Sequence, residues 1–311
     1  MSGKGESKVA VVAAVIGNLV IAIIKFVASA LTGSSAMISE GIHSLVDTGN
    51  GGLVFMGMRL GTAPADAEHP FGHGKELYFW TLIVAISIFG IGGGMSVYEG
   101  ITHLLHPVHV KNPWPNYIVL AIAAVVEGTS FVIAMRQLNK VRGTVSVSKY
   151  IRTSKDPSLF TVVFEDSAAM LGLIIAFFGI WLGQLTGSPF FDGAASVTIG
   201  LILMGVAFLL ARESKGLLIG EGVEPAVLAR MRDIVGAEQA VDAVGDIRTM
   251  YLGPNDLLVN LDVVFCSGLP AEQIHNAVGR IEAALKGTYP EIGRIYIEAD
   301  SLVDVHAAAQ A

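Results

Sequence analysis

The sequence predicts an α-helical membrane protein, in which six transmembrane helices precede a small cytoplasmic α+β domain with a ferredoxin-like fold. Of the 311 residues, 52% are hydrophobic and only 15% are charged. Soluble domains carry about 25% charged residues, so this shortage of charge indicates that lipid is part of the solvent. Long apolar stretches also follow one another until about residue 212, after which apolar and polar residues alternate.

Six stretches reach or approach the roughly 20 apolar residues that a helix needs to cross a bilayer core. The second is the least apolar, because it contains Glu40, His43, Asp47 and Asn50, and it must therefore face other helices or water. No small-residue cleavage pattern accompanies the first stretch, so we expect an uncleaved span rather than a signal peptide. The predicted spans are residues 9–31, 36–60, 77–103, 117–137, 159–185 and 194–212.

Positive charge predicts the orientation of these spans. With both termini on one side, that side receives nearly all of the Lys and Arg residues that flank the spans, and the opposite side receives only Lys111. The positive-inside rule therefore predicts a multi-pass integral membrane protein with both termini cytoplasmic, in the inner membrane if the protein is bacterial. A net charge of −7 argues against a nucleic-acid partner. Cys266 is the only cysteine, which excludes an intramolecular disulfide.

The membrane domain is predicted to occupy residues 1–215, the cytoplasmic domain residues 216–302, and a disordered tail residues 303–311. Residues 257–265 alternate in the way that is typical of a strand, and the turn at residues 253–256 predicts a hairpin with a strand near residues 246–251. Helices at residues 225–235 and 274–285 and a short strand at residues 294–297 complete the domain. The order helix, strand, strand, helix, strand fits a sheet with helices on one face.

The second and fifth spans carry the strongest metal-binding pattern. His43 and Asp47 are four residues apart, so a helix places an imidazole and a carboxylate on one face, where they can hold one divalent ion. Asn50 follows on the same stripe. Glu165 and Asp166 project about 100° apart on a helix, so one of them is expected to join His43 and Asp47. The alternatives are a hydrogen-bonded polar face and acids solvated at the cytoplasmic end, but ionisable residues inside a membrane favour a functional site.

The loop between the second and third spans contains a second metal-binding pattern. Asp66, His69 and His73, which we call the loop triad, offer three ligands within eight residues. Gly72, between the two histidines, and Gly74, after them, allow the backbone to fold around an ion. An ordinary exposed surface loop is the alternative.

Other polar residues of the spans have two interpretations each. Glu99 and Glu127 either carry protons or pair with polar helix neighbours, and Lys25 either reaches the interface or pairs with an acid. The glycine cluster within residues 90–94 predicts a close approach between helices. Three histidines are predicted in the outer loop, where a plain interfacial loop is favoured over an ion funnel: His103, His106 and His109.

Together, these motifs resemble the cation diffusion facilitator family of metal/proton antiporters, from about residue 8 to residue 300. The resemblance rests on the His43-x-x-x-Asp47 pair, the loop from His69 to Lys75, the acid of the fifth span and the C-terminal domain. It implies a transporter rather than an enzyme. Its expected activity is efflux of a divalent transition metal, zinc first, in exchange for protons, by a homodimer that alternates between inward- and outward-open states.

The resemblance also implies a tetrahedral site with two ligands from each of the second and fifth spans. His43, Asp47 and Asp166 fall on three of these positions, whereas the fourth is Val162, which cannot bind metal. Glu165 or water is expected to substitute, as in the branch related to mitochondrial zinc transporters, where Glu-Asp-Ser-Ala-Ala occurs as it does at residues 165–169. A site with more oxygen ligands suits manganese or iron better, so an exporter of Mn²⁺, Fe²⁺ or Co²⁺ with the same fold stays open.

For the rest of the chain, the resemblance implies that the loop triad is a further metal site. Lys75 corresponds to a residue that forms an ion pair near the membrane surface, and Glu221 is the partner considered for it. The cytoplasmic domain is expected to dimerise without a strong metal site, since few of its residues match the metal positions of the family: His275, Glu298 and Asp300.

The expected partners are a second copy of the chain, a divalent metal ion, protons and membrane lipid. A different function class, a membrane metal sensor or metal-binding partner protein without transport, stays open because the site in the fifth span is incomplete. Intramembrane hydrolysis is disfavoured, since the span count and the basic loops offer no substrate groove.

Overall fold

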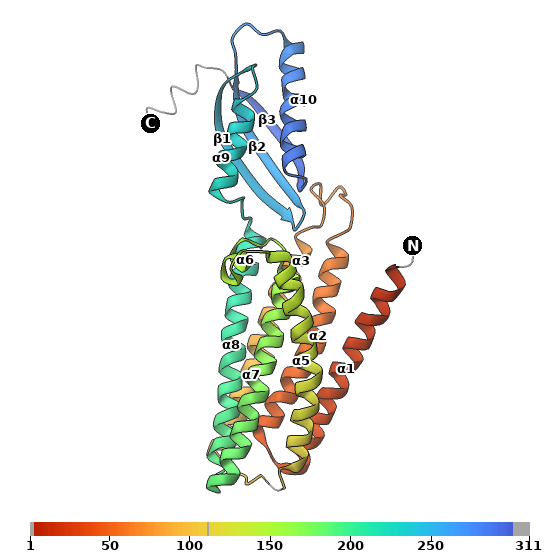
Figure 1. The fold of residues 1–311 in the computed structure, drawn as a ribbon, viewed down its shortest axis with the longest axis vertical. Helices are drawn as coiled ribbons and strands as arrows, with labels where there is room; N and C mark the ends of the chain where they lie inside the picture. Colours follow the sequence, from red (N-terminus) through yellow and green to blue (C-terminus); the bar gives the residue numbers. More distant parts are fainter. Residues whose placement is uncertain (1–2, 111, 301–311) are drawn as a thin grey trace. The chain divides into compact units, whose positions relative to one another are not determined.

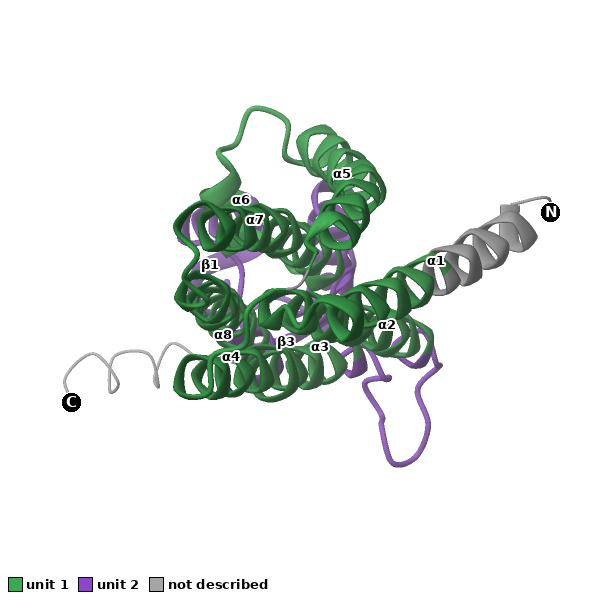
Figure 2. Ribbon diagram, turned by 90° about the horizontal axis from the view of Figure 1, so that it is seen from below, with its two compact units in different colours: residues 1–59, 77–215 green, residues 60–76, 216–311 purple. Residues whose placement is uncertain are grey.

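The computed structural model describes residues 3–110 and 112–300, and it describes side chains over residues 17–110 and 112–299. The chain divides into two compact units, shown in different colours in Figure 2. The first contains residues 1–59 and 77–215, and the second contains residues 60–76 and 216–311. Residues 60–76, predicted as part of the membrane domain, thus cluster with the C-terminal unit.

The first unit is a bundle of helices that run side by side in both ribbon views (Figures 1 and 2). A π-helical segment, η1, joins α3 to α4, so these three elements form one continuous helix over residues 76–105. The helices are α1 (Gly3–Thr32), α2 (Ser35–Leu60), α3 (Glu76–Ser87), η1 (Ile88–Gly94), α4 (Met95–Leu105), α5 (Trp114–Arg142), α6 (Val147–Thr153), α7 (Pro157–Thr186) and α8 (Phe190–Ile219).

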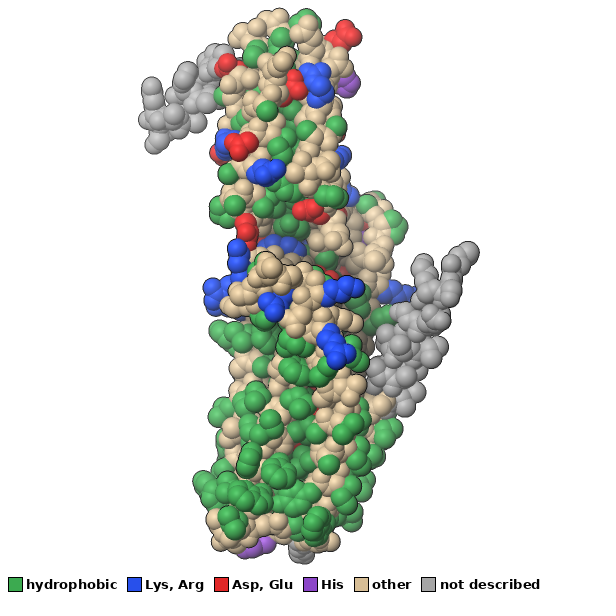
Figure 3. Space-filling view, in the orientation of Figure 1, with side chains coloured by type: hydrophobic (Ala, Val, Ile, Leu, Met, Phe, Trp, Pro, Cys, Tyr) green, Lys and Arg blue, Asp and Glu red, His purple; other side chains and the backbone are tan. Residues whose placement is uncertain are grey.

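Four helices of the described chain are long and apolar enough to cross a membrane: Glu76–Leu105, Trp114–Arg142, Pro157–Thr186 and Phe190–Ile219. The apolar part described for α1, Gly17–Thr32, is shorter, and α2 contains ionisable residues. On the face of the bundle that Figure 3 shows, hydrophobic side chains are spread over the surface, and Lys and Arg side chains gather at the level of α6. The prediction of a helical membrane protein is confirmed, whereas the count of six spans is not.

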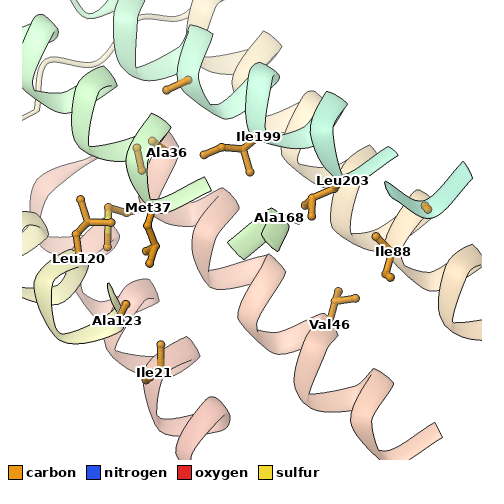
Figure 4. Close-up of a cluster of buried hydrophobic side chains, with 14 of the residues drawn as sticks. Ile21, Ala36, Met37, Val46, Ile88, Leu120, Ala123, Ala168, Ile199 and Leu203 are labelled. Atoms are coloured by element: carbon orange, nitrogen blue, oxygen red, sulfur yellow. The ribbon is translucent and has the colours of Figure 1, made fainter. Parts of the chain in front are cut away.

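The interior of the bundle is built largely from aliphatic side chains and alanines. Met37 and Val46 of α2 lie among neighbours from other helices, including Ala168 of α7 and Leu203 of α8 (Figure 4). Alanine and glycine at contact positions let helices approach closely, which is the usual way that helices associate in lipid. The close packing holds α2 and α7, which carry the predicted ligands, within one core.

Glycines bring α8 against the continuous helix of residues 76–105. A Cβ atom added at Gly200 would lie 2.7 Å from the backbone oxygen of Gly93, and one added at Gly100 would lie 2.8 Å from that of Gly193. The predicted close approach is therefore present at Gly93, and the glycine cluster coincides with the π-helical segment. Gly90, in contrast, has open space where its side chain would be.

Local signals fix the limits of α7. The Oδ1 atom of Asp156 accepts a hydrogen bond from the backbone N–H of Ser158 at 3.0 Å, which caps the helix start. Pro157 is its first residue, a position where the missing N–H costs nothing. Gly187 follows the helix with a left-handed φ of +67°. These limits place Glu165 and Asp166 in the third turn of the helix.

The second unit contains a three-stranded sheet in the described residues, in the order β1-β2-β3. β1 and β2 are antiparallel, and β2 and β3 are parallel, joined by a crossover through α10. The elements are α9 (Pro225–Gly236), β1 (Val241–Gly253), β2 (Asp256–Phe265), α10 (Ala271–Thr288) and β3 (Ile292–Asp300). The predicted order and the α+β class are confirmed, although the first and last strands are longer than predicted.

Alternate residues of β2 form the core of this unit. Leu257, Val259 and Leu261 are fully buried and pack in one cluster with Met231 of α9 and Ile281 of α10. Both helices therefore cover the same face of the sheet. The predicted tail, residues 303–311, lies outside the described residues.

Candidate metal sites

His43 and Asp47 lie together on α2, as their spacing predicts. The Nδ1 atom of His43 is 3.4 Å from Oδ1 of Asp47, and the His43 side chain is only 2% exposed. The Nε2 atom of His43 and the Oδ1 atom of Asp47 are buried without a hydrogen-bond partner among the described residues. Buried polar atoms are seldom left unpaired, so two metal-capable atoms in this condition fit a site that receives a cation.

The two acids of α7 point in different directions, as adjacent residues on a helix do. Glu165 is buried and faces α2, where its Oε1 accepts a hydrogen bond from Nδ2 of Asn50 at 2.8 Å. Asp166 is half-buried and faces α5, where its Oδ2 accepts a hydrogen bond from Oγ of Ser130 at 3.0 Å. The acid that bonds to α2 is thus Glu165. The family resemblance, in contrast, implies Asp166 as the ligand. The ligand role of both residues stays a prediction.

A cavity of about 590 Å³ in the first unit reaches three of the predicted metal-site positions. Asp47, Glu165 and Val162 all contribute to its wall, so the valine at the fourth ligand position faces the same space as two of the acids. The remaining wall is mostly apolar and is made by α1, α2, α5 and α7: Asn18, Thr48, Gly51, Val54, Phe55, Met58, Ala134, Gln137, Lys140, Val141, Ser158 and Leu159.

Lys25 is fully buried and pairs with acids, one of its two predicted arrangements. Its Nζ lies 2.8 Å from Oε2 of Glu40, 2.8 Å from Oε1 of Glu127 and 2.8 Å from Oγ of Ser44. Glu127 therefore pairs with a polar neighbour, as one of its two interpretations predicts. The sequence did not show which acids Lys25 would meet, because the three helices α1, α2 and α5 bring together residues up to 102 positions apart.

The loop triad is assembled in the second unit. Its three side chains offer ligand atoms that all lie within 4.8 Å of one another, and no other group of three or more His, Cys, Asp or Glu side chains in the described residues does so. The Nε2 atom of His73 is 3.1 Å from Oδ2 of Asp66, and Nδ1 of His69 is 3.3 Å from Oδ1 of Asp66. Gly72, with a left-handed φ of +85°, makes the turn between the two histidines.

Hydrogen bonds hold the Asp66 carboxylate in place. Its Oδ1 accepts from the backbone N–H groups of His69 at 2.6 Å and Glu68 at 2.9 Å. The bond from the His69 backbone, followed by the bond from the His73 ring, lowers the pKa of Asp66 to about 2. The triad therefore presents an ionised carboxylate beside two imidazoles at neutral pH, a donor set that suits zinc.

His103 was predicted in the outer loop, but it is a buried residue of α4. Its Nε2 lies 3.7 Å from Oδ2 of Asp192, the buried acid in the first turn of α8. Asp192 accepts hydrogen bonds from Oγ of Ser34 at 2.6 Å and from the backbone N–H of Ser35 at 2.5 Å. Asp192 was not identified from the sequence, in which its only signal is an acid beside an apolar stretch. His106 and His109 are exposed, as expected for loop residues.

Two of the predicted metal positions of the C-terminal domain, His275 and Glu298, belong to opposite faces of the sheet. His275 is exposed on α10, which covers the face of the sheet that Leu261 enters. Glu298 pairs in register with Asp262 of β2, next to Leu261, and therefore belongs to the opposite face. The side chain of Asp300 lies outside the described residues.

Lys75 contacts the start of the C-terminal segment inside the second unit. Its Nζ is 3.4 Å from the backbone oxygen of Leu218 and 3.8 Å from Sδ of Met250. An ion pair of Lys75 with Glu221 stays a prediction.

Comparison with known proteins gives matches over both units. Residues 11–219 match the cation efflux transmembrane domain, and residues 223–302 match the cytoplasmic domain of cation efflux proteins. Among curated proteins, the chain is similar to the mitochondrial proton-coupled zinc antiporter SLC30A9 of Mus musculus. The two are 35% identical over 265 residues, which cover 84% of this chain and 46% of that protein. The chain thus spans about half the length of this relative.

Two more distant relatives match over most of the chain. Metal tolerance protein C4 of Arabidopsis thaliana is 27% identical over 285 residues, or 90% of this chain and 62% of that protein. The magnetosome protein MamM of Paramagnetospirillum magneticum is 27% identical over 290 residues, or 91% of this chain and 85% of that protein.

Proposed function

Because the chain belongs to the cation efflux family, we propose that it exports a divalent transition-metal ion, zinc first, in exchange for protons. The family is one of transporters and not of enzymes, which agrees with the expectation from sequence. Zinc and proton exchange are proposed because the mouse relative is named as a proton-coupled zinc antiporter. Mn²⁺, Fe²⁺ and Co²⁺ are the competing substrates, since Val162 and Glu165 leave the site richer in oxygen.

The cavity that reaches Asp47 and Glu165 is the observation that carries this proposal. It extends along α2 from Asp47 to Met58 and along α7 from Glu165 to Ser158, distances of about 16 Å and 10 Å at the helical rise. It therefore leads from two buried or half-buried acids to the helix ends near α6. An ion that enters by this route reaches Asp47, which lies 3.4 Å from the ring of His43, whose Nε2 atom has no hydrogen-bond partner among the described residues.

We propose six spans with both termini cytoplasmic, so that α1 and α2 also cross the membrane. Support comes from α2, whose Glu40, His43 and Asn50 are buried inside the bundle, where a membrane helix must place its polar residues. The basic residues near α6 support the orientation, since the cytoplasmic side carries an excess of Lys and Arg: Lys140, Arg142, Lys149, Arg152 and Lys155. The cavity then faces the cytoplasm.

The proposed cycle couples metal to protons through ligand protonation. His43 and Asp47 must lose any bound proton before they can hold a metal ion, so the binding of metal releases protons. A site that opens to a more acidic compartment takes up protons and releases the ion. Alternation between the two openings by a homodimer is part of the proposal, and the match of residues 223–302 to the cytoplasmic domain of the family supports self-association.

Flux measurements in proteoliposomes test the proposal. His43→Ala and Asp47→Ala should each reduce zinc uptake driven by a pH gradient by roughly 100-fold or more, because loss of even an outer-sphere partner typically costs 10- to 100-fold. His106→Ala, which removes an exposed histidine, is the matched control and should transport at the parent rate. Parent-level uptake by either α2 variant would refute the site assignment. Competition among zinc, manganese, iron and cobalt in the same assay identifies the substrate.

A membrane metal sensor is the second candidate, and one observation favours it. Within the described residues, the ligand atoms of the loop triad lie within 4.8 Å of one another, whereas those of no three His, Asp or Glu residues in α2 and α7 do. A sensor would bind zinc through the triad and show no flux under an imposed pH gradient. Zinc uptake by the parent protein under that gradient would exclude it.

A further inference from the structure

The buried group of Lys25, Glu40, Glu127 and Ser44 has a charge imbalance that the metal site does not explain. Two carboxylates share one ammonium group, with both Nζ–O distances at 2.8 Å. If both acids are ionised, the group carries one excess negative charge. The Lys25 and Glu40 side chains are fully buried and that of Glu127 is 12% exposed. An uncompensated charge in the interior of a membrane helix bundle is costly.

The oxygens that do not face Lys25 show where this imbalance lies. Oε1 of Glu40 and Oε2 of Glu127 are both buried without a hydrogen-bond partner among the described residues. Oε1 of Glu40 lies against Gly172 of α7, so closely that a Cβ atom at this position would collide with it. Each acid therefore has one oxygen bound to the ammonium and one oxygen free to carry a proton.

We propose that Lys25, Glu40 and Glu127 form a proton-binding site, separate from the metal-binding residues, that takes up a proton as the metal ion leaves. This inference rests on the proposed exchange of metal for protons. The proton comes from water and is held by an outer carboxylate oxygen of Glu40 or Glu127, so the group becomes neutral. Release returns the proton to water, and no other bond forms or breaks.

The structure also supplies a route by which metal expels this proton. On α2, Glu40 lies one turn before His43, and Oγ of Ser44, the residue after His43, is 2.8 Å from Nζ of Lys25. The same hydroxyl of Ser44 donates a hydrogen bond to Oε1 of Glu127 at 3.4 Å, so the group adjoins the predicted ligand pair of α2. A divalent cation held by His43 and Asp47 therefore disfavours a further positive charge on the neighbouring acids, and protonation of those acids disfavours the cation in equal measure.

Two simpler roles fit the group less well. A metal site would place a cation where the ammonium of Lys25 already sits, in contact with both acids and with Ser44. A purely structural ion pair needs one acid for one lysine, and a second acid adds a buried charge that must be compensated. The second acid is explained if the group alternates between a charged and a neutral state.

Infrared difference spectroscopy tests the proposal without transport. A protonated carboxylic acid has a C=O stretching band that the carboxylate lacks. Zinc added to the purified parent protein at constant pH should remove such a band. Glu40→Gln and Glu127→Gln should each lose this zinc-induced change, whereas Glu213→Gln, which alters a half-buried glutamate of α8 outside the group, should keep it. Identical zinc-induced spectra in all four proteins would overturn the proposal, as would a parent spectrum without the band.

Transport separates failure of this proposal from failure of the proposed function. In vesicles at equal internal and external pH, zinc-for-zinc exchange by the two Gln variants should stay within about twofold of the parent. Acceleration of zinc uptake by a pH gradient should fall about tenfold, within the range typical of coupled sites. Exchange that is absent in the parent refutes the transport function. An unchanged pH-gradient response in a folded Glu40→Gln or Glu127→Gln variant refutes the proton site alone.

Discussion

Asp66 shows how one exposed carboxylate can organise a loop. It accepts hydrogen bonds from two backbone N–H groups and contacts the rings of His69 and His73. Its pKa of about 2 in the folded loop lies below its usual value of 3.8, so these contacts favour the ionised form. Because the folded value is the lower one, the stabilisation is fully present above about pH 4 and is lost as the pH falls through 2.

Replacement of Asp66 by asparagine should therefore weaken zinc binding by the loop triad at neutral pH by roughly tenfold or more, since it removes a charged ligand that also orients two histidines. Calorimetric titration in a background that carries His43→Ala and Asp47→Ala restricts the measurement to the loop. Glu68→Gln is the control, because its side chain is exposed and outside the triad. Equal zinc affinities in the two variants would show that the triad does not bind the ion.

At this scale, contacts within one helix turn or one short loop could be predicted, whereas contacts between helices could not. His43 and Asp47 meet because the α-helical repeat brings residues four apart onto one face. Lys25 meets Glu127 across 102 positions, and Glu165 rather than Asp166 turns to Asn50. These pairings depend on how the helices rotate against one another, and one sequence holds no signal for that rotation.

The close crossing of α8 with the continuous helix of residues 76–105 can be tested by adding a methyl group at the contact. Gly200→Ala should push these helices apart, because the new methyl group would meet the Gly93 oxygen and Val97. Overpacking of this kind typically costs about 1–3 kcal/mol. Gly205→Ala, in the same helix, places its methyl group in open space and is the matched control. Thermal unfolding in detergent compares the two variants, and equal unfolding temperatures would contradict the tight crossing.

Among the elements, those with a regular apolar period could be predicted most fully. The order of α9, β1, β2, α10 and β3 followed from alternation and helical spacing, since each period marks a buried face. The π-helical segment η1 could not be predicted, because a run of glycines has no side-chain period to mark its turns. The membership of residues 60–76 in the second unit was also hidden, since it depends on contacts such as that of Gly74 with Leu252.

The orientation of the whole molecule can be measured through Cys266, the only cysteine of the chain. It follows β2 and is half-buried, with Sγ 3.7 Å from the backbone oxygen of Gln239. If the second unit is cytoplasmic, a small thiol reagent that cannot cross membranes should label Cys266 in inside-out vesicles and not in right-side-out vesicles. Cys266→Ser is the control for background labelling. Labelling only in right-side-out vesicles would reverse the proposed topology.

The chain passes between its two units at three peptide bonds: 59–60, 76–77 and 215–216. Each bond lies at the end of a helix, namely the end of α2, the start of α3 and the last turns of α8. These helices are therefore covalently continuous with segments of the second unit, whereas α5 and α7 connect only to other parts of the first unit. His43 and Asp47 lie on α2, which continues directly into the second unit, and Glu165 and Asp166 lie on α7, which does not. The two halves of the candidate metal site therefore differ in connectivity, because only the α2 half lies on a helix whose chain continues directly into the second unit.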